Sequence, residues 1–199
     1  RIFTKDYFLN LAKELEKMGA DMISVKDMAG LIPPLKTGRL IKLLKENTKV
    51  PIDFHTHCTP GYGLASTLTA ILNGVDIVDT SIGSFAGGPA APAFEIIQIF
   101  CDKLNIDTGV DKKAVAEIAK ELRIIRKELA EHDSYKKFPI EFDISNYTLP
   151  KEIDKLFDLA IQEAKEEKEE NLLETTQEIE KYFNYPEPDE SIKKAEIPG

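Results

Sequence analysis

The chain has 199 residues, 42% of them hydrophobic and 31% charged, a composition typical of a globular protein long enough to bury a core. Its 26 basic and 35 acidic residues give a net charge of −9, which argues against a nucleic-acid groove or an anionic membrane surface as the main partner. The sequence has two cysteines and neither a membrane-span-length apolar run nor a leader-like start. We therefore expect a cytoplasmic protein that neither binds nucleic acid nor inserts into a membrane.

The charge divides the chain into two parts. Residues 1–110 carry 11 basic and 12 acidic residues, whereas residues 111–199 carry 15 and 23. We expect the chemistry in the first part, 1–110, and a helical acidic extension with an irregular tail in the second, 111–199.

Helices and strands alternate along the first part. Apolar residues three and four apart predict helices, whereas alternation of apolar and polar residues predicts strands. Such alternation is typical of βαβ units around a parallel sheet, and no Gly-x-Gly-x-x-Gly follows a strand to indicate a dinucleotide site. The spacing of the strands suits consecutive units of a (βα)₈ barrel, of which three strands form only a part. The predicted helices are 4–19, 37–47, 63–73 and 93–104, and the predicted strands are 21–27, 51–57 and 75–81.

The second part is predicted to be mainly helical. A helix capped by Asp111 runs to about residue 131, and its stripe of Val115, Ile118, Leu122 and Ile125 is predicted to pack against the barrel. An irregular segment follows at 134–147. A charged helix from Pro150 to about residue 170, a short helix at 172–183 and an extended tail from residue 186 complete the chain.

A His-x-His pair lies in the second predicted strand. Because side chains alternate between the two faces of a strand, His55 and His57 share one face with Asp53, while Ile52 and Phe54 point to the other. Two neutral imidazoles on one face can bind a divalent metal ion. The alternative is a buried histidine pair that is satisfied by hydrogen bonds.

Lys26 lies on the corresponding face of the preceding predicted strand, near its carboxyl end, where barrels place their active sites. An ammonium group beside a divalent cation would be repelled, so Lys26 would be a neutral base or would be converted into an anionic carbamate by carbon dioxide. The alternative is an ordinary surface lysine paired with Asp27, Asp53 or Asp79.

Three segments together carry a family resemblance. Val25-Lys-Asp-Met-Ala-Gly-Leu31, Phe54-His-Thr-His-Cys-Thr-Pro-Gly61 and Gly74-Val-Asp-Ile-Val-Asp-Thr80 resemble the carboxyltransferase domain of biotin-dependent enzymes. These enzymes are the pyruvate carboxylase B subunit, the oxaloacetate decarboxylase alpha subunit and the transcarboxylase central subunit. The resemblance covers residues 1 to about 130.

The resemblance implies a TIM barrel in which this chain supplies strands six to eight, followed by a helical extension. It implies a metal site held by a carbamylated Lys26, by His55 and by His57, with zinc as the metal and cobalt or manganese as alternatives. It also implies carboxyl transfer between carboxybiotin and a 2-oxo acid, pyruvate or oxaloacetate. The partners would be a biotin carboxyl carrier domain and biotin carboxylase, and we expect a homo-oligomer.

The sequence also departs from the family pattern. The family's first-strand aspartate ligand and its substrate-binding residues have no counterpart, so we expect an internal fragment that is inactive by itself. We name no catalytic residue beyond the metal site and no residue that binds a cofactor.

Two other interpretations remain open. A metallolyase or synthase of the isopropylmalate synthase and hydroxymethylglutaryl-CoA lyase group also carries a His-x-His, but lacks the lysine ligand. The third interpretation is a non-catalytic structural module.

Overall fold

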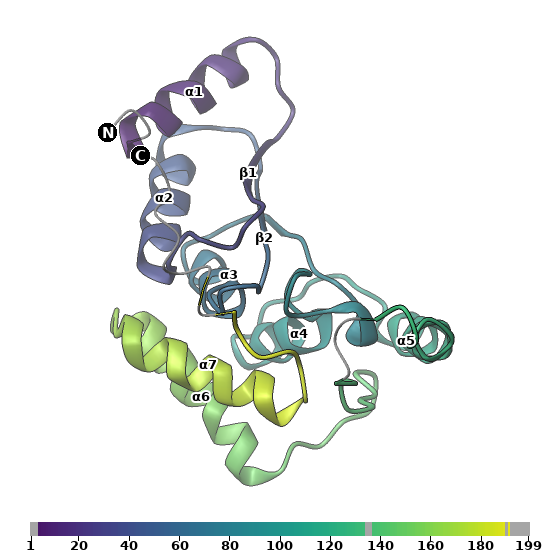
Figure 1. The fold of residues 1–199 in the computed structure, drawn as a ribbon. Coiled ribbons are helices and arrows are strands. Elements are labelled where there is room, and N and C mark those ends of the chain that lie inside the picture. Colours follow the sequence, from purple (N-terminus) through teal and green to yellow (C-terminus); the bar gives the residue numbers. More distant parts are fainter. Residues whose placement is uncertain (1–3, 134–136, 190, 192–199) are drawn as a thin grey trace.

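The structure is a computed structural model that describes residues 4–133, 137–189 and 191. Three parallel strands form a sheet in the order β1-β2-β3, and helices pack beside it (Figure 1). This arrangement fits an incomplete (βα)₈ barrel. The elements are α1 (Lys5–Lys17), β1 (Ile23–Asp27), α2 (Pro34–Asn47), β2 (Ile52–Thr56), α3 (Gly63–Leu72), β3 (Ile77–Val78), the 3₁₀ helix η1 (Gly83–Phe85), α4 (Phe94–Lys103), α5 (Lys112–Glu128), α6 (Lys151–Lys165) and α7 (Glu169–Tyr182).

The two faces of the sheet differ in polarity. Parallel pairing sets Ser24 opposite Asp53 and Lys26 opposite His55, so these four side chains share one face. The other face is apolar and packs against α1, α2 and α3, because the alternate residues of each strand are hydrophobic. The core on this face consists of Ala12, Ile23, Ile41, Leu44, Ile52, Phe54 and Ala70.

A second core joins the helical extension to the first part of the chain. It brings together side chains from α3, α4, α6 and α7, and the rings of Phe100 and Phe157 lie 4.8 Å apart at its centre. The helices α6 and α7 lie side by side and cover α3 (Figure 1). The extension therefore buries part of the βα region instead of standing apart from it.

Several predicted boundaries change in the structure. The third strand is shorter than the predicted 75–81, because β3 is an edge strand that pairs with β2 alone. The charged run 165–170 does not continue one helix, since α6 ends at Lys165 and α7 begins at Glu169. Glu167, with φ of 55°, reverses the chain between them. The predicted irregular segment lies partly, and the predicted extended tail mostly, outside the described residues.

The helix predicted from residue 111 is confirmed, but its predicted packing is only half right. Asp111 accepts hydrogen bonds from the backbone N–H groups of Lys113 and Ala114, as an N-cap should. Val115 is buried, whereas Ile118 and Ile125 are 47% and 44% exposed. The helix packs through its amino-terminal turn and through Arg126, which donates to the carbonyl oxygen of Ser84 in η1, so the centre of the apolar stripe faces outward.

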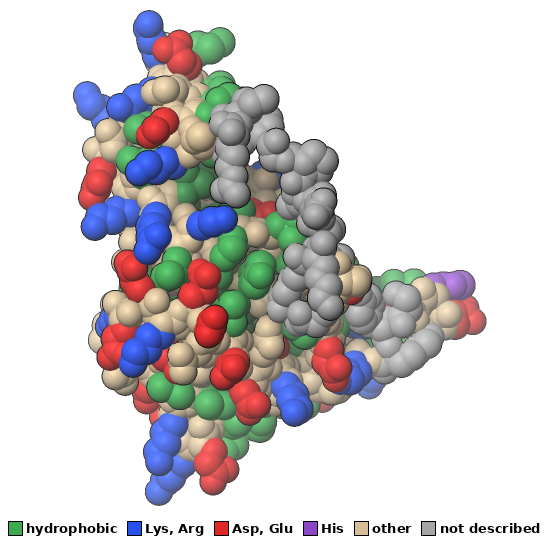
Figure 2. Space-filling model, turned by 60° about the vertical axis from the view of Figure 1, so that its left-hand side comes forward, with side chains coloured by type: hydrophobic (Ala, Val, Ile, Leu, Met, Phe, Trp, Pro, Cys, Tyr) green, Lys and Arg blue, Asp and Glu red, His purple; other side chains and the backbone are tan. Residues whose placement is uncertain are grey.

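The surface mixes charges of both signs. On the face shown in Figure 2, acidic and basic side chains both occur and are interspersed. Among the described helices, none is long and apolar enough to cross a membrane.

Candidate metal-binding site

The two histidines of the His-x-His pair face each other at the carboxyl end of β2. Their Nε2 atoms lie 3.0 Å apart, and their ring centroids lie 5.0 Å apart. His55 is the penultimate residue of β2, and His57 directly follows Thr56, the last residue of the strand. The alternation of side chains along the strand therefore brings both rings to one side.

The other nitrogen of each ring is already hydrogen-bonded. His55 Nδ1 lies 2.7 Å from Asp79 Oδ2, and His57 Nδ1 lies 2.6 Å from the carbonyl oxygen of Pro89. Neither a carboxylate nor a carbonyl oxygen can donate, so both Nδ1 atoms carry the proton and donate it. In the neutral rings, both Nε2 atoms then carry lone pairs.

Two lone pairs 3.0 Å apart repel each other unless a proton or a cation lies between them. A divalent metal ion removes this repulsion, since neutral imidazole nitrogens are its usual ligands. The Asp79 carboxylate behind His55 repeats the outer hydrogen bond that metal-bound histidines commonly make. The donor set of the pair therefore fits a divalent ion.

Lys26 lies beside this pair. The parallel register sets it opposite His55 on the same face of the sheet, and its side chain is exposed. The three aspartates considered as ordinary partners are engaged elsewhere. Asp27 accepts two backbone N–H bonds from the following loop, Asp53 accepts a hydroxyl hydrogen bond from β1, and Asp79 contacts His55. The role of Lys26 as a ligand remains a prediction.

Asp53 lies two residues before His55 on the same face of β2, and one of its two carboxylate oxygens has no hydrogen-bond partner among the described residues. Its Oδ2 accepts the hydroxyl hydrogen of Ser24 at 2.5 Å. Its Oδ1 is buried and has no hydrogen-bond partner among the described residues. The polar face of the sheet thus carries an unsatisfied buried acceptor next to the histidine pair.

Two glycines hold the backbone of His57 in place. A Cβ atom on Gly30 would lie 2.1 Å from the carbonyl oxygen of His57, and one on Gly63 would lie 2.7 Å from the same atom. Gly30 also has φ of +65°, which favours glycine. The loop after β1 and the first turn of α3 can approach His57 this closely because neither glycine has a side chain.

Sequence reasoning missed the residues that orient the rings. Asp79 lies two residues after Ile77, the partner of Asp53 in the register, so the alternation of β3 could have placed it opposite His55. The Pro89 carbonyl had no sequence signal, since any residue offers a backbone oxygen. Among the described residues, no group of three or more His, Cys, Asp or Glu side chains could hold a metal ion. A metal ion bound by the two histidines would therefore need further ligands of another residue type, or ligands from outside the described residues.

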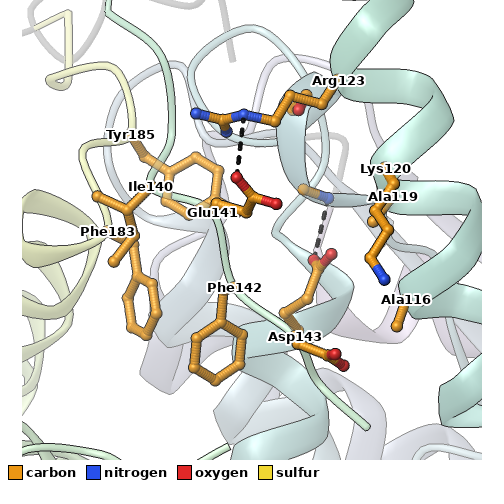
Figure 3. Close-up of a pocket in the computed structure, with 13 residues that line it drawn as sticks. Ala116, Ala119, Lys120, Arg123, Ile140, Glu141, Phe142, Asp143, Phe183 and Tyr185 are labelled. Atoms are coloured by element: carbon orange, nitrogen blue, oxygen red, sulfur yellow. Dashed lines mark hydrogen bonds and ion pairs between the residues drawn. The ribbon is translucent and has the colours of Figure 1, made fainter. Parts of the chain in front are cut away.

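A small cavity elsewhere in the molecule contains none of the predicted site residues. It has a volume of about 50 Å³ and lies between α5, the segment 140–143 and the residues after α7 (Figure 3). Its wall includes Glu95, whose Oε2 accepts a hydrogen bond from the backbone N–H of Gly83, and burial raises the pKa of this carboxyl group. Glu95 ties η1 to the start of α4, which is a structural role.

Comparisons with known proteins match the site-bearing part of the chain. The HMGL-like family model matches residues 3–122. The pyruvate carboxylase B subunit of Methanocaldococcus jannaschii is 44% identical over 117 residues, which cover 59% of this chain and 21% of that protein. The methylmalonyl-CoA carboxyltransferase 5S subunit of Propionibacterium freudenreichii is 34% identical over 139 residues, which cover 69% of this chain and 26% of that protein.

The fold matches as well. The carboxyl transferase domain of Rhizobium etli pyruvate carboxylase, solved with pyruvate, superposes with a TM-score of 0.64 and 34% identity over 80% of this chain and 27% of that chain. The chain therefore spans 21% to 27% of the lengths of these three proteins. The resemblance to carboxyltransferase domains is confirmed, and the chain belongs to the HMGL-like family.

Proposed function

We propose that the protein containing this chain transfers a carboxyl group between carboxybiotin and a 2-oxo acid, pyruvate or oxaloacetate, and that the chain supplies part of its metal site. The observation that carries the proposal is the pair of Nε2 atoms of His55 and His57, 3.0 Å apart, with both Nδ1 atoms already donating. The relatives support the reaction class, since one is part of a pyruvate carboxylase and another is part of a carboxyltransferase.

His55 and His57 would hold a divalent ion through Nε2, with zinc as the first candidate and cobalt or manganese as alternatives. When bound, the ion supplies Lewis acidity towards a keto oxygen. Asp79 and the Pro89 carbonyl keep the two lone pairs aimed at one point. These residues act as ligands and orienting groups, not as acids or bases.

Lys26 would contribute an oxygen ligand. Its neutral amine would add to the carbon of carbon dioxide, so that a nitrogen–carbon bond forms as one carbon–oxygen π bond breaks; the nitrogen, positively charged after this addition, would then lose a proton to solvent and leave an anionic carbamate. The exposure of Lys26 leaves its amine accessible to carbon dioxide. A cation beside the product would stabilise it, which links modification of Lys26 to metal binding.

The finer architecture belongs to the same proposal. β1, β2 and β3 would be strands six, seven and eight of the barrel, and the boundary between the barrel units and the helical extension would lie at residue 110. Biotin would arrive on a separate carrier domain after carboxylation by biotin carboxylase, and the protein would be a cytoplasmic homo-oligomer.

The test is Lys26→Arg in the full-length protein, because arginine keeps the positive charge and cannot form the carbamate. We expect loss of bound metal and of pyruvate-dependent consumption of carboxybiotin, with an unchanged circular dichroism spectrum. Lys36→Arg, at an exposed position in α2, is the matched control and should retain both.

Full metal content and a near-normal rate in Lys26→Arg would reject the carbamate and favour a metallolyase of the isopropylmalate synthase group. A wild-type protein that binds no metal and transfers no carboxyl group would instead indicate a structural module.

A further inference from the structure

Helix α5 lies at the outer edge of the molecule, away from the sheet, and is only partly covered (Figure 1). Its buried residues mark the side that packs against η1, and they are Val115, Ala116 and Arg126. Beside them runs a second row of large apolar side chains, three of which are 44% to 47% exposed. This row, called the outer seam below, consists of Ile118, Leu122, Ile125 and Leu129.

The spacing of the outer seam is that of a helix that packs lengthwise against another helix. Its four residues are separated by four, three and four positions, which is the a/d spacing of a coiled coil. Side chains at these positions form the holes into which the apolar side chains of a second helix insert. The exposure of the seam shows that the described part of the chain leaves these positions largely open.

The outer seam continues into an apolar groove at the carboxyl end of α5. Leu129 belongs to both, since it also lines a groove of about 320 Å³ together with Phe85, Pro89 and Pro186. Phe85 is 38% exposed at the edge of this groove. The open apolar surface therefore runs along α5 to the loop whose Pro89 carbonyl accepts the hydrogen bond from His57.

Three glutamates border the outer seam. Counting about 3.6 residues per turn places Glu117, Glu121 and Glu128 along the side of the seam that is opposite to the packed side. All three are exposed, and within the described part of the chain none of them forms an ion pair. A helix that lies on the seam meets this acidic border, which attracts lysine and arginine and repels carboxylates.

The acidic border disfavours a second copy of this chain as the occupant. In an antiparallel pair of α5 helices, Glu121 of one copy would face Glu128 of the other, so that like charges would meet. A parallel pair would need Arg126 as the partner of Glu121. Arg126 is 8% exposed and already donates to the carbonyl oxygen of Ser84, so it is not available.

We propose that the outer seam of α5 and the groove beyond Leu129 form a docking surface for a partner protein that presents an amphipathic helix with a basic border. The apolar face of that helix would pack on the seam, and its lysines or arginines would lie against the three glutamates. The inference does not depend on the proposed metal site, because no residue of the seam or of its acidic border is a candidate ligand.

The experiment measures the binding of a fluorescent synthetic helix to the full-length protein by anisotropy. The probe is a peptide of about three heptads with leucine at a and d and lysine at e and g, and a comparison peptide carries glutamate in place of lysine. We expect the lysine peptide to bind at least about ten-fold more tightly than the glutamate peptide. The difference should shrink at high salt, which screens the exposed charges.

Substitutions on α5 locate the binding surface. Ile118→Ser together with Ile125→Ser should weaken binding of the lysine peptide about ten-fold or more, because two apolar contacts are lost. Ile124→Ser, at a 52% exposed position of the same helix outside the seam, is the matched control and should bind as wild type does. Because all three side chains are exposed, these changes should leave the melting temperature nearly unchanged.

The acidic border is tested separately. Glu121→Gln together with Glu128→Gln keeps the size of both side chains and removes their charges. This variant should lose most of the preference for the lysine peptide over the glutamate peptide.

Equal binding of the two peptides to the wild-type protein would overturn the proposal, and so would wild-type affinity in the variant with Ile118→Ser and Ile125→Ser. A wild-type protein that binds neither peptide would also overturn it, and a large fall in the melting temperature of that variant would then show that the rest of the protein covers the seam. A smaller oligomer in the same variant, measured by sedimentation equilibrium, would assign the seam to a second copy of the chain instead.

Discussion

The carboxylate of Asp79 determines which nitrogen of His55 remains free for a metal. By accepting from Nδ1 at 2.7 Å, it fixes the tautomer whose lone pair is on Nε2. We expect Asp79→Ala to lower metal affinity about 10- to 100-fold, since the ring can then rotate or change tautomer. Isothermal titration of the metal-free protein measures this, with Asp21→Ala as an exposed aspartate control. Equal affinities of Asp79→Ala and wild type would contradict this role.

Gly30 shows how a missing side chain shapes the site. A Cβ at Gly30 would meet the His57 carbonyl, whereas one at Gly19 would meet nothing within 4 Å, and both residues have positive φ. Gly19→Ala should therefore cost about 1 to 2 kcal/mol of unfolding free energy from backbone strain alone. Gly30→Ala should cost more, although its φ of +65° suits alanine better than the +98° of Gly19. Urea unfolding measures the unfolding free energy of both variants. Equal losses in Gly19→Ala and Gly30→Ala would show that the loop containing Gly30 moves away from the His57 carbonyl without cost.

Among the helices, α5 and α7 bury their apolar residues very differently. Ile118 of α5 is 47% exposed, whereas Ile179 of α7 is fully buried at 0%. Ile179→Ala should destabilise the protein by about 2 to 5 kcal/mol, because it leaves a cavity in a packed core. The same substitution at Ile118 should change the unfolding free energy by less than about 0.5 kcal/mol. A large loss at Ile118 in denaturant titrations would mean that its helix face is covered in solution.

The metal site should also be visible in the stability of the whole protein. A ligand that binds only the folded state stabilises it by about 2.7 kcal/mol when present at 100 times its dissociation constant. Removing the metal with a chelator should therefore lower the melting temperature of the wild-type protein. The double variant His55→Ala, His57→Ala should show no such shift, because the ligands are absent. Equal shifts in both proteins would place the metal elsewhere.

The protonation of Glu180 should also make the stability of the whole protein depend on pH. Burial raises its pKa to about 8, so the folded protein holds a proton that the unfolded chain releases at lower pH. Its contribution to stability is complete below the unfolded pKa and is lost as the pH rises through about 8. Glu180→Gln should therefore flatten the decline of stability between pH 5 and 8, as measured by urea unfolding, while Glu178→Gln should not. An unchanged slope in Glu180→Gln would show that the carboxyl group is ionised in the folded state.

The order of helices and strands in the first part could be predicted from the sequence, because periodicity reports directly which residues face a core. The shared face of Lys26, Asp53 and His55 followed from the same alternation, and the parallel register bears it out. The packing of α5 could not be predicted in this way. Periodicity shows that an apolar stripe exists, but not how much of it the rest of the molecule covers.

The sequence by itself determined the βα alternation, the His-x-His pair and the family, since these depend on neighbouring residues and short spacings. Only the tertiary structure decided that Asp79 and the Pro89 carbonyl orient the two imidazole rings. These contacts join residues 24 and 32 positions apart. Their geometry depends on loop conformation and helix packing, which local sequence patterns do not encode.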